Sequence, residues 1–122
     1  NLANPNNPTG YTLTTEELME LVDIARSVGA YIVCDEIYRG LSDEYMYSIC
    51  DLYEKGICTS STSKVFSSAG TRVGWIVTRD LGIKENLMNL RSYQSICEGP
   101  INELIAAIVL ENKDLFYRRS HH

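Results

Sequence analysis

Residues 30–40 read Ala-Tyr-Ile-Val-Cys-Asp-Glu-Ile-Tyr-Arg-Gly, and this stretch decides the class of fold. The run Tyr31–Cys34 is short, apolar and β-prone, without alternation of polar and apolar side chains, which is typical of a strand buried on both faces of a sheet. Gly29 comes shortly before the run, and Asp35 and Glu36 follow it directly. The sequence therefore predicts a buried strand with two carboxylates at its carboxyl end.

Helices and strands are predicted to alternate on either side of this strand. Before it, Thr14 and Glu17 have capping-box spacing, and apolar residues then recur with helical periodicity at Leu18, Leu21, Val22, Ala25 and Val28. After it, a helix is expected at residues 46–55 and strands at residues 57–61 and 73–77. Because this alternation is the pattern of α/β proteins, we expect a mostly parallel sheet in a three-layer α/β/α arrangement.

Two more helices are expected towards the carboxyl end. The first spans residues 83 to about 95. The second begins at Pro100, since proline suits the first helical position, and it carries an apolar stripe formed by Ile101, Leu104, Ile105, Ile108 and Val109. Such a stripe needs a partner surface.

Composition and charge narrow the class of protein. The 122 residues are 44% hydrophobic and 22% charged, as in an ordinary globular protein. The net charge is -5 and no basic run occurs, so we expect neither a nucleic-acid partner nor an anionic membrane surface. No metal site is expected, because both histidines end the chain and no C-x-x-C pair occurs among Cys34, Cys50, Cys58 and Cys97. Scattered thiols favour a reducing, cytoplasmic location.

Four motifs follow one another along the chain: Asn-Pro-Asn-Asn-Pro-Thr-Gly at residues 4–10, Asp-Glu-Ile-Tyr-Arg-Gly at 35–40, Ser-Thr-Ser-Lys at 61–64 and Gly-Thr-Arg-Val-Gly-Trp at 70–75. In this order they resemble the cofactor-binding region of class I/II aminotransferases, which are pyridoxal 5'-phosphate (PLP) enzymes of fold type I. The resemblance covers nearly the whole chain and weakens after Arg91. It implies that residues 1–122 are an internal part of the large PLP-binding domain, without the upstream segment of that domain and without the small domain.

The resemblance assigns the central chemistry to two side chains. Lys64 would hold PLP as an imine and later act as a base, roles that suit a lysine whose pKa is lowered by burial or by nearby cations. Asp35 would pair with the protonated pyridine nitrogen of PLP, at the strand end where α/β sheets bind ligands. Taken alone, Lys64 also fits a solvated loop lysine, and Asp35 fits a cap for the next turn. Its neighbour Glu36 is interpreted as structural.

The remaining positions would hold the ring oxygen and the phosphate of PLP. Asn7 and Tyr38 match the residues that hydrogen-bond the phenolic oxygen of the ring. Ser61 and Arg72 match phosphate ligands, with Ser63 a weaker match. Taken alone, Asn7 also fits a turn residue before a proline, and Arg72 fits a surface ion pair.

The implied function is transamination between an amino acid and a 2-oxo acid, by a homodimer. Because complete family members are several times longer, the 122 residues alone are expected to be inactive. Two alternatives remain open, since they share the PLP motifs. One is a carbon–sulfur β-lyase or a relative of aminocyclopropane carboxylate synthase, and the other is the PLP-binding part of a transcription regulator. These motifs do not identify the amino acid.

Overall fold

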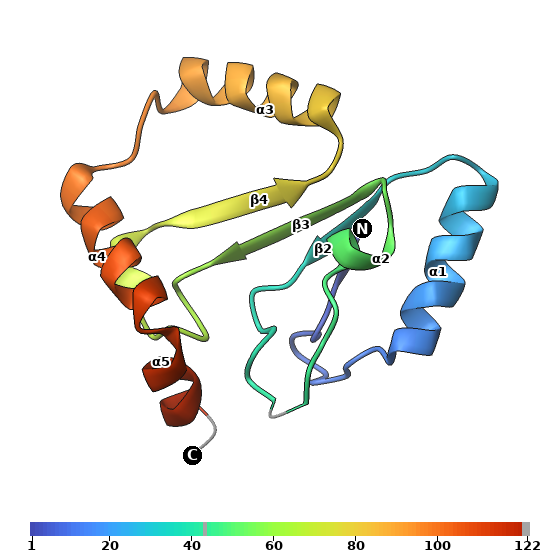
Figure 1. Ribbon diagram of the computed structural model, residues 1–122, viewed down its shortest axis with the longest axis horizontal. Coiled ribbons are helices and arrows are strands. Elements are labelled where there is room, and N and C mark those ends of the chain that lie inside the picture. Colours follow the sequence, from blue (N-terminus) through green and yellow to red (C-terminus); the bar gives the residue numbers. More distant parts are fainter. Residues whose placement is uncertain (43, 121–122) are drawn as a thin grey trace.

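The computed structural model describes residues 1–42 and 44–120. Its elements in chain order are β1 (Leu2–Ala3), α1 (Thr15–Ser27), β2 (Ile32–Asp35), α2 (Ile49–Leu52), β3 (Gly56–Ser61), the 3-10 turn η1 (Ala69–Thr71), β4 (Gly74–Thr78), α3 (Leu81–Gln94), α4 (Pro100–Glu111) and α5 (Lys113–Ser120). The strands form one sheet in the order β1-β2-β3-β4 (Figure 1). The predicted α/β fold is confirmed.

The sheet is parallel from β1 to β3, whereas β4 runs antiparallel to β3. A helix-containing connection returns the chain to the same starting edge between β1 and β2 and between β2 and β3. No α-helix lies between β3 and β4, so the chain turns back instead of crossing over. The sheet is thus mostly parallel, as predicted, with one reversed strand.

The main core lies where α1, α2 and the first three strands meet. Buried side chains of α1 pack on those of the sheet and of α2, namely Leu18, Val22, Ala25, Ile32, Cys34, Ile49, Cys50, Tyr53 and Cys58. Burial alternates along β2, because Ile32 and Cys34 are buried whereas Val33 is half-buried. The prediction that this strand is buried on both faces is therefore not met within the described residues.

Helix α1 begins as the capping box predicts. The Thr14 hydroxyl accepts the Glu17 N–H at 3.2 Å, and the Glu17 carboxylate accepts the Thr14 N–H at 2.8 Å. Gly29 follows the helix with a left-handed φ of 69°, which suits glycine. Leu21 and Val28 belong to the predicted apolar face but are exposed.

The helix expected at residues 46–55 is reduced to the single turn α2. Ser48 caps its start, with a hydroxyl that accepts the Cys50 N–H, and the backbone is already extended at Tyr53, where φ is −138°. The buried Tyr53 side chain donates its hydroxyl to the Ala30 carbonyl at 2.7 Å. Burial of this ring against α1 and the sheet favours ending the helix there.

The carboxyl-terminal helices build a second, smaller core. Val109 of α4 packs with the buried Val65 and Phe66, and these contact Trp75, Phe116 and Tyr117. The sequence did not predict α5, whose aromatic residues reach Phe66. No helix within the described residues is long and apolar enough to cross a membrane.

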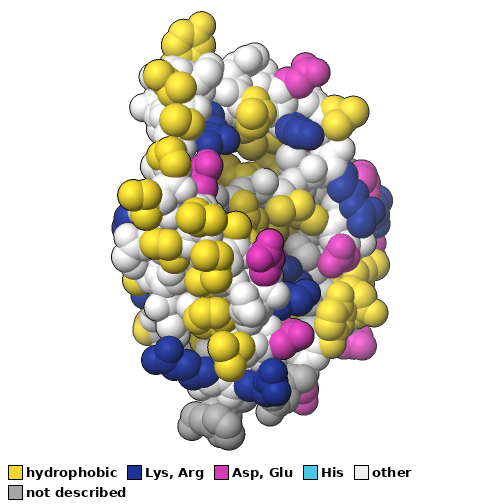
Figure 2. Space-filling model, turned by 60° about the vertical axis from the view of Figure 1, so that its left-hand side comes forward, with side chains coloured by type: hydrophobic (Ala, Val, Ile, Leu, Met, Phe, Trp, Pro, Cys, Tyr) yellow, Lys and Arg dark blue, Asp and Glu magenta, His cyan; other side chains and the backbone are white. Residues whose placement is uncertain are grey.

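Most of the predicted apolar stripe of α4 faces outward. Ile101, Leu104 and Ile108 are 73%, 62% and 52% exposed, and only Val109 of the stripe is buried. Figure 2 shows many hydrophobic side chains at the surface of this face of the molecule. Helical periodicity identifies an apolar side of a helix but not its partner. Within the described residues, that side of α4 is largely uncovered.

Candidate cofactor site at the carboxyl edge of the sheet

All seven predicted site residues lie at one edge of the sheet. Asn7 follows β1, Asp35 ends β2 with Tyr38 just beyond it, and Ser61 ends β3 with Ser63 and Lys64 in the following turn. Arg72 precedes β4, whose first residue, Gly74, pairs with Ser61. The carboxyl ends of the parallel strands and the amino end of the reversed strand therefore meet, which is where open α/β sheets bind ligands.

The structure brings two of these side chains into direct contact. Asn7 donates its Nδ2 hydrogen to the Tyr38 hydroxyl oxygen at 3.1 Å. The loop that carries Asn7 is held by Asn4, which is buried, donates its N–H to the Asp35 carbonyl at 2.9 Å and accepts the Leu13 N–H at 2.9 Å. Sequence reasoning gave no role to Asn4, because asparagine is common in turns and its burial depends on the fold.

A groove of about 420 Å³ runs beside this pair. The loop at residues 5–8 forms one wall, and Tyr38, Leu41 and Ser42 contribute to the other. The Asn4–Pro5 and Asn7–Pro8 peptides are both cis. The groove thus adjoins the hydroxyl and the amide that were predicted to hold the ring oxygen.

Asp35 caps the next turn while keeping one oxygen available. Its Oδ1 accepts the Ile37 N–H at 3.1 Å, which matches the turn-cap interpretation. Its Oδ2 makes no hydrogen bond within the described residues, and the side chain is exposed. The cap orients the carboxylate and does not exclude a ligand from it.

Glu36 is a structural residue, as predicted. It is 3% exposed, and its Oε1 accepts the Ser48 hydroxyl at 2.9 Å and the Ile49 N–H at 2.8 Å. Its Oε2 lies 2.9 Å from the Nε of Arg39. This carboxylate joins the end of β2 to the start of α2 and to the segment that carries Tyr38.

The turn after β3 presents Lys64 to solvent. The Ser61 hydroxyl oxygen accepts the Ser63 N–H at 3.1 Å, and the Lys64 carbonyl accepts the Ser67 N–H at 3.0 Å. Val65 and Phe66 are buried in the second core. The backbone on both sides of Lys64 is therefore anchored while its amine remains exposed.

Arg72 stands in a left-handed conformation, with φ at 55°. Its Nη1 donates to the Ala69 carbonyl at 3.1 Å. The alternative interpretation of Arg72 was a surface ion pair, but no ion pair to Arg72 occurs within the described residues. Within residues 1–42 and 44–120, no hydrogen bond joins the side chains of Asp35, Lys64 and Arg72 to one another. They share an edge of the sheet without being in contact.

Sequence reasoning also missed Thr62 and Thr71. Both are buried, and their hydroxyl oxygens lie 2.7 Å apart within the loop that carries Lys64. Threonine is common in loops and at strand ends, so nothing in the sequence distinguishes these two from the exposed ones. Their pairing depends on the tertiary fold.

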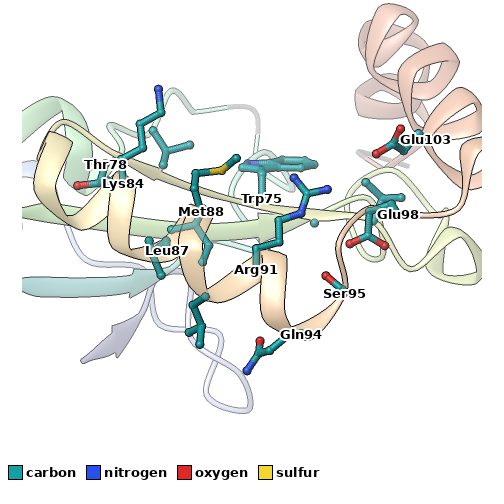
Figure 3. A pocket seen from close by; sticks show the side chains of 15 residues that line it. Trp75, Thr78, Lys84, Leu87, Met88, Arg91, Gln94, Ser95, Glu98 and Glu103 are labelled. Atoms are coloured by element: carbon teal, nitrogen blue, oxygen red, sulfur yellow. The ribbon is translucent and has the colours of Figure 1, made fainter.

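A larger groove of about 750 Å³ lies between β4 and α3. Met88 and Arg91 reach from α3 towards Trp75 on β4 (Figure 3). None of the seven predicted residues lines it. Within residues 1–42 and 44–120, no group of His, Cys, Asp and Glu side chains is arranged to hold a metal ion.

The buried thiols are predicted to be unreactive at neutral pH. Burial raises the pKa of Cys34 and of Cys58 to about 12, with the negative charge of Glu36 adding to the shift, and burial also raises the pKa of Cys50. Only Cys97 of the four is exposed. A thiol reagent at pH 8 should therefore modify one thiol in the folded protein and all four after unfolding; fast reaction of two or more would contradict this.

The same thiols predict a loss of stability in alkali. In the unfolded chain Cys34 and Cys58 ionise near pH 9, whereas burial in the folded protein raises the pKa of each to about 12. Their contribution to stability is complete below the unfolded pKa and decreases as pH rises from 9 to 12. Urea unfolding curves at pH 8 and pH 10 would measure the decrease.

Comparison with known proteins agrees with the geometry. The family model for aminotransferase class I and II matches residues 1–117. Aromatic-amino-acid aminotransferase 2 of Thermococcus litoralis is 28% identical over 114 residues, which cover 89% of this chain and 29% of that protein.

Solved structures that match this chain include an aminotransferase and a C-S lyase. A PLP-dependent aminotransferase from Streptococcus suis matches with a TM-score of 0.90 and 39% identity, over 97% of this chain and 31% of that one. The PLP-bound C-S lyase of Staphylococcus hominis matches with a TM-score of 0.81 and 26% identity, over 99% of this chain and 31% of that one. This chain spans about a third of the length of the proteins it matches. It belongs to the class I and II aminotransferase family.

Proposed function

We propose that the protein containing this chain is a PLP-dependent transaminase that moves an amino group between an amino acid and a 2-oxo acid. Residues 1–122 would form part of its large, cofactor-binding domain. One observation carries the proposal: in a chain of this family, seven side chains suited to PLP lie at one edge of one sheet, namely Asn7, Asp35, Tyr38, Ser61, Ser63, Lys64 and Arg72.

The chemistry of these side chains fits PLP. An aldehyde needs an amine, which Lys64 offers, and a pyridinium nitrogen needs a carboxylate, which Asp35 offers through Oδ2. The phenolic oxygen of PLP needs hydrogen-bond donors. In the contact at 3.1 Å the Tyr38 hydroxyl oxygen accepts a hydrogen from Asn7, so the hydroxyl hydrogen of Tyr38 remains available to donate. A phosphate needs a cation and hydroxyls, and Arg72 stands near Ser61 on neighbouring strand ends.

Lys64 is proposed to carry the proton transfer. When bound, PLP supplies an electron sink that makes the α-hydrogen of an amino acid acidic. The neutral Nζ of Lys64 would attach the cofactor, and once released it would accept that proton and deliver it to the cofactor carbon that was the aldehyde carbon. The anchors at Val65 and Phe66 limit the movement of the backbone, so the amine moves by side-chain rotation.

The other residues are proposed to bind and orient. Asp35 would keep the proton on the ring nitrogen, with its carboxylate oriented by the Ile37 N–H. Asn7 and Tyr38 would stabilise negative charge on the ring oxygen. Arg72 and Ser61 would hold the phosphate and with it the whole ring relative to Lys64.

A carbon–sulfur β-lyase is the second candidate, favoured by the match to the C-S lyase structure over 99% of this chain. The match to the Streptococcus suis aminotransferase is closer, at a TM-score of 0.90 against 0.81. Product analysis of the protein carrying this chain separates the two. Amine exchange between an amino acid and a 2-oxo acid supports transamination, whereas ammonia and pyruvate from a cysteine-type substrate would support the lyase.

Borohydride reduction with peptide mapping tests the attachment site. The protein would be incubated with PLP, reduced and digested, beside Lys64→Ala and the matched surface variant Lys84→Ala. We expect a single stable adduct at Lys64, absent in Lys64→Ala and retained in Lys84→Ala. Adducts spread over several lysines, or none, would count against the proposal.

We also propose a cytoplasmic homodimer. All four cysteines are free thiols, as favoured in a reducing compartment. The exposed apolar side chains of α4 are suited to a protein contact. With a net charge of -5, neither nucleic acid nor membrane is proposed as a partner. Sedimentation equilibrium of the protein would give its oligomeric state.

A further inference from the structure

A buried pair of hydroxyl groups lies within the loop that joins β3 to β4. Thr62 is fully buried and Thr71 is 6% exposed, and their Oγ1 atoms are 2.7 Å apart. Thr71 donates its hydroxyl to the Ser68 carbonyl at 2.8 Å. Thr62 lies 3.2 Å from the Val73 carbonyl and 3.4 Å from that of Ser68. Both hydroxyls are therefore satisfied inside the loop.

The loop is also tied at both of its ends and in its middle. The Thr62 N–H donates to the Val73 carbonyl at 3.1 Å and closes the loop at its base. The Thr62 carbonyl accepts the Ser68 N–H at 3.0 Å, and the Ser68 carbonyl accepts the Thr71 N–H at 3.2 Å. Thr62, Ser68 and Thr71 thus form a compact hydrogen-bonded unit.

The order of the hydroxyl donors follows from the distances. Since Thr71 gives its hydrogen to the Ser68 carbonyl at 2.8 Å, Thr62 gives its own to Thr71 at 2.7 Å. The shortest set of contacts is therefore a chain from Thr62 through Thr71 to Ser68. Removal of the Thr71 hydroxyl leaves the Ser68 carbonyl without that donor and breaks the chain of hydrogen bonds in its middle.

The paired threonines adjoin the predicted phosphate ligands in sequence. Ser61 immediately precedes Thr62, and Arg72 immediately follows Thr71. The backbone of Arg72 has a left-handed φ of 55°. Residues other than glycine rarely adopt this conformation unless the surrounding structure holds them in it. The contact between Thr62 and Thr71 therefore ties the backbone next to Ser61 to the backbone next to Arg72, and Lys64 lies on the loop between them.

We propose that Thr62 and Thr71 are positioning residues for the phosphate of the cofactor. They would act through Ser61 and Arg72, without touching the cofactor, and they would set the selectivity of the site for PLP over its dephosphorylated form, pyridoxal. This inference rests on the proposed function, because it needs PLP to be the ligand at this edge of the sheet.

The test compares the binding of PLP and of pyridoxal to Thr71→Val, which removes the hydroxyl and keeps the shape of the side chain. We expect PLP binding to weaken about tenfold and pyridoxal binding to change less than about twofold, because only PLP uses Ser61 and Arg72 fully. Thr71→Ser keeps the hydroxyl and should restore the selectivity. Dissociation constants from the change in cofactor absorbance measure both ligands without any substrate.

Two further variants keep the test decisive. Thr78→Val is the matched control. Thr78 is the last residue of β4, at the edge of the sheet opposite to the predicted site, and the variant loses only the hydroxyl that accepts the Asp80 N–H. It should leave the selectivity for PLP over pyridoxal unchanged. If Thr71→Val fails to fold, Thr62→Val takes its place, because Thr71 there keeps its bond to Ser68.

The outcomes separate this inference from the proposed function. Equal weakening of PLP and pyridoxal, or the same loss of selectivity in Thr78→Val, would overturn the positioning role while the protein still binds PLP. A wild-type protein that binds neither PLP nor pyridoxal would overturn the proposed function itself. Loss of selectivity confined to the Thr62 and Thr71 variants supports the inference.

Discussion

Replacing Lys64 by alanine is expected to lower the rate of transamination by about 10⁴-fold, since the variant loses both the amine that attaches the cofactor and the base that moves the α-proton. The fold should be retained, because the Lys64 side chain is exposed and no hydrogen bond to it occurs within the described residues. Affinity for PLP should fall less than the rate does, as Ser61 and Arg72 remain. Single-turnover rates with an amino acid in excess, beside a binding titration, would measure the two effects.

Lys64→Arg provides the sharper control for this prediction. Arginine keeps the positive charge but cannot lose its proton near neutral pH, so it cannot serve as a nucleophile or a base. We expect it to be as inactive as Lys64→Ala, whereas Lys84→Ala, an exposed lysine on α3, should retain the wild-type rate. Substantial activity in Lys64→Arg would mean that Lys64 contributes only its charge, and the proposed role would be wrong.

Replacing Glu36 by alanine is expected to lower the free energy of unfolding by about 3 kcal/mol, because a carboxylate that is buried and hydrogen-bonded is lost together with its partners' contacts. The Ile49 N–H and the Ser48 hydroxyl each lose an acceptor inside the core, and Arg39 loses its ion-pair partner. The variant should also loosen the segment that carries Tyr38, which begins directly after Glu36. Urea unfolding followed by circular dichroism would give the change in stability.

The matched control is Glu54→Ala. Glu54 also pairs with an arginine, Arg26, at 3.2 Å, but both side chains are largely exposed, and exposed ion pairs contribute little to stability. Its removal should leave the unfolding midpoint almost unchanged. If the two variants were equally stable, the buried contacts of Glu36 would not hold the start of α2 as the structure indicates.

The sequence predicted the order of the elements because local signals define them. The capping box at Thr14 and Glu17, the apolar run at Tyr31–Cys34 and Pro100 all mark elements found in the structure. It failed where packing outweighs periodicity. The helix expected at residues 46–55 is a single turn in the structure, because Tyr53 packs into the core. Helix α5 was not predicted, and its aromatic residues pack on Phe66, which is distant in sequence.

Part of the candidate site could likewise be anticipated from local sequence. A residue after a buried strand must lie at the strand end, so Asp35 and Ser61 could be placed there without coordinates. The contact between Asn7 and Tyr38 joins residues 31 positions apart and requires β1 beside β2 in the observed parallel register. The position of Arg72 depends on the reversal of β4, which no motif specifies.

The sequence by itself determined which chemical groups this protein has and where the capped helices α1 and α4 begin, since motifs and caps depend on residues a few positions apart. Only the tertiary structure decided which groups meet. The pairing of Thr62 with Thr71, the burial of Glu36 and the outward face of α4 each depend on surfaces brought together from distant segments. Burial and hydrogen bonding in a folded chain are properties of those shared surfaces, and periodicity along one segment does not specify the partner.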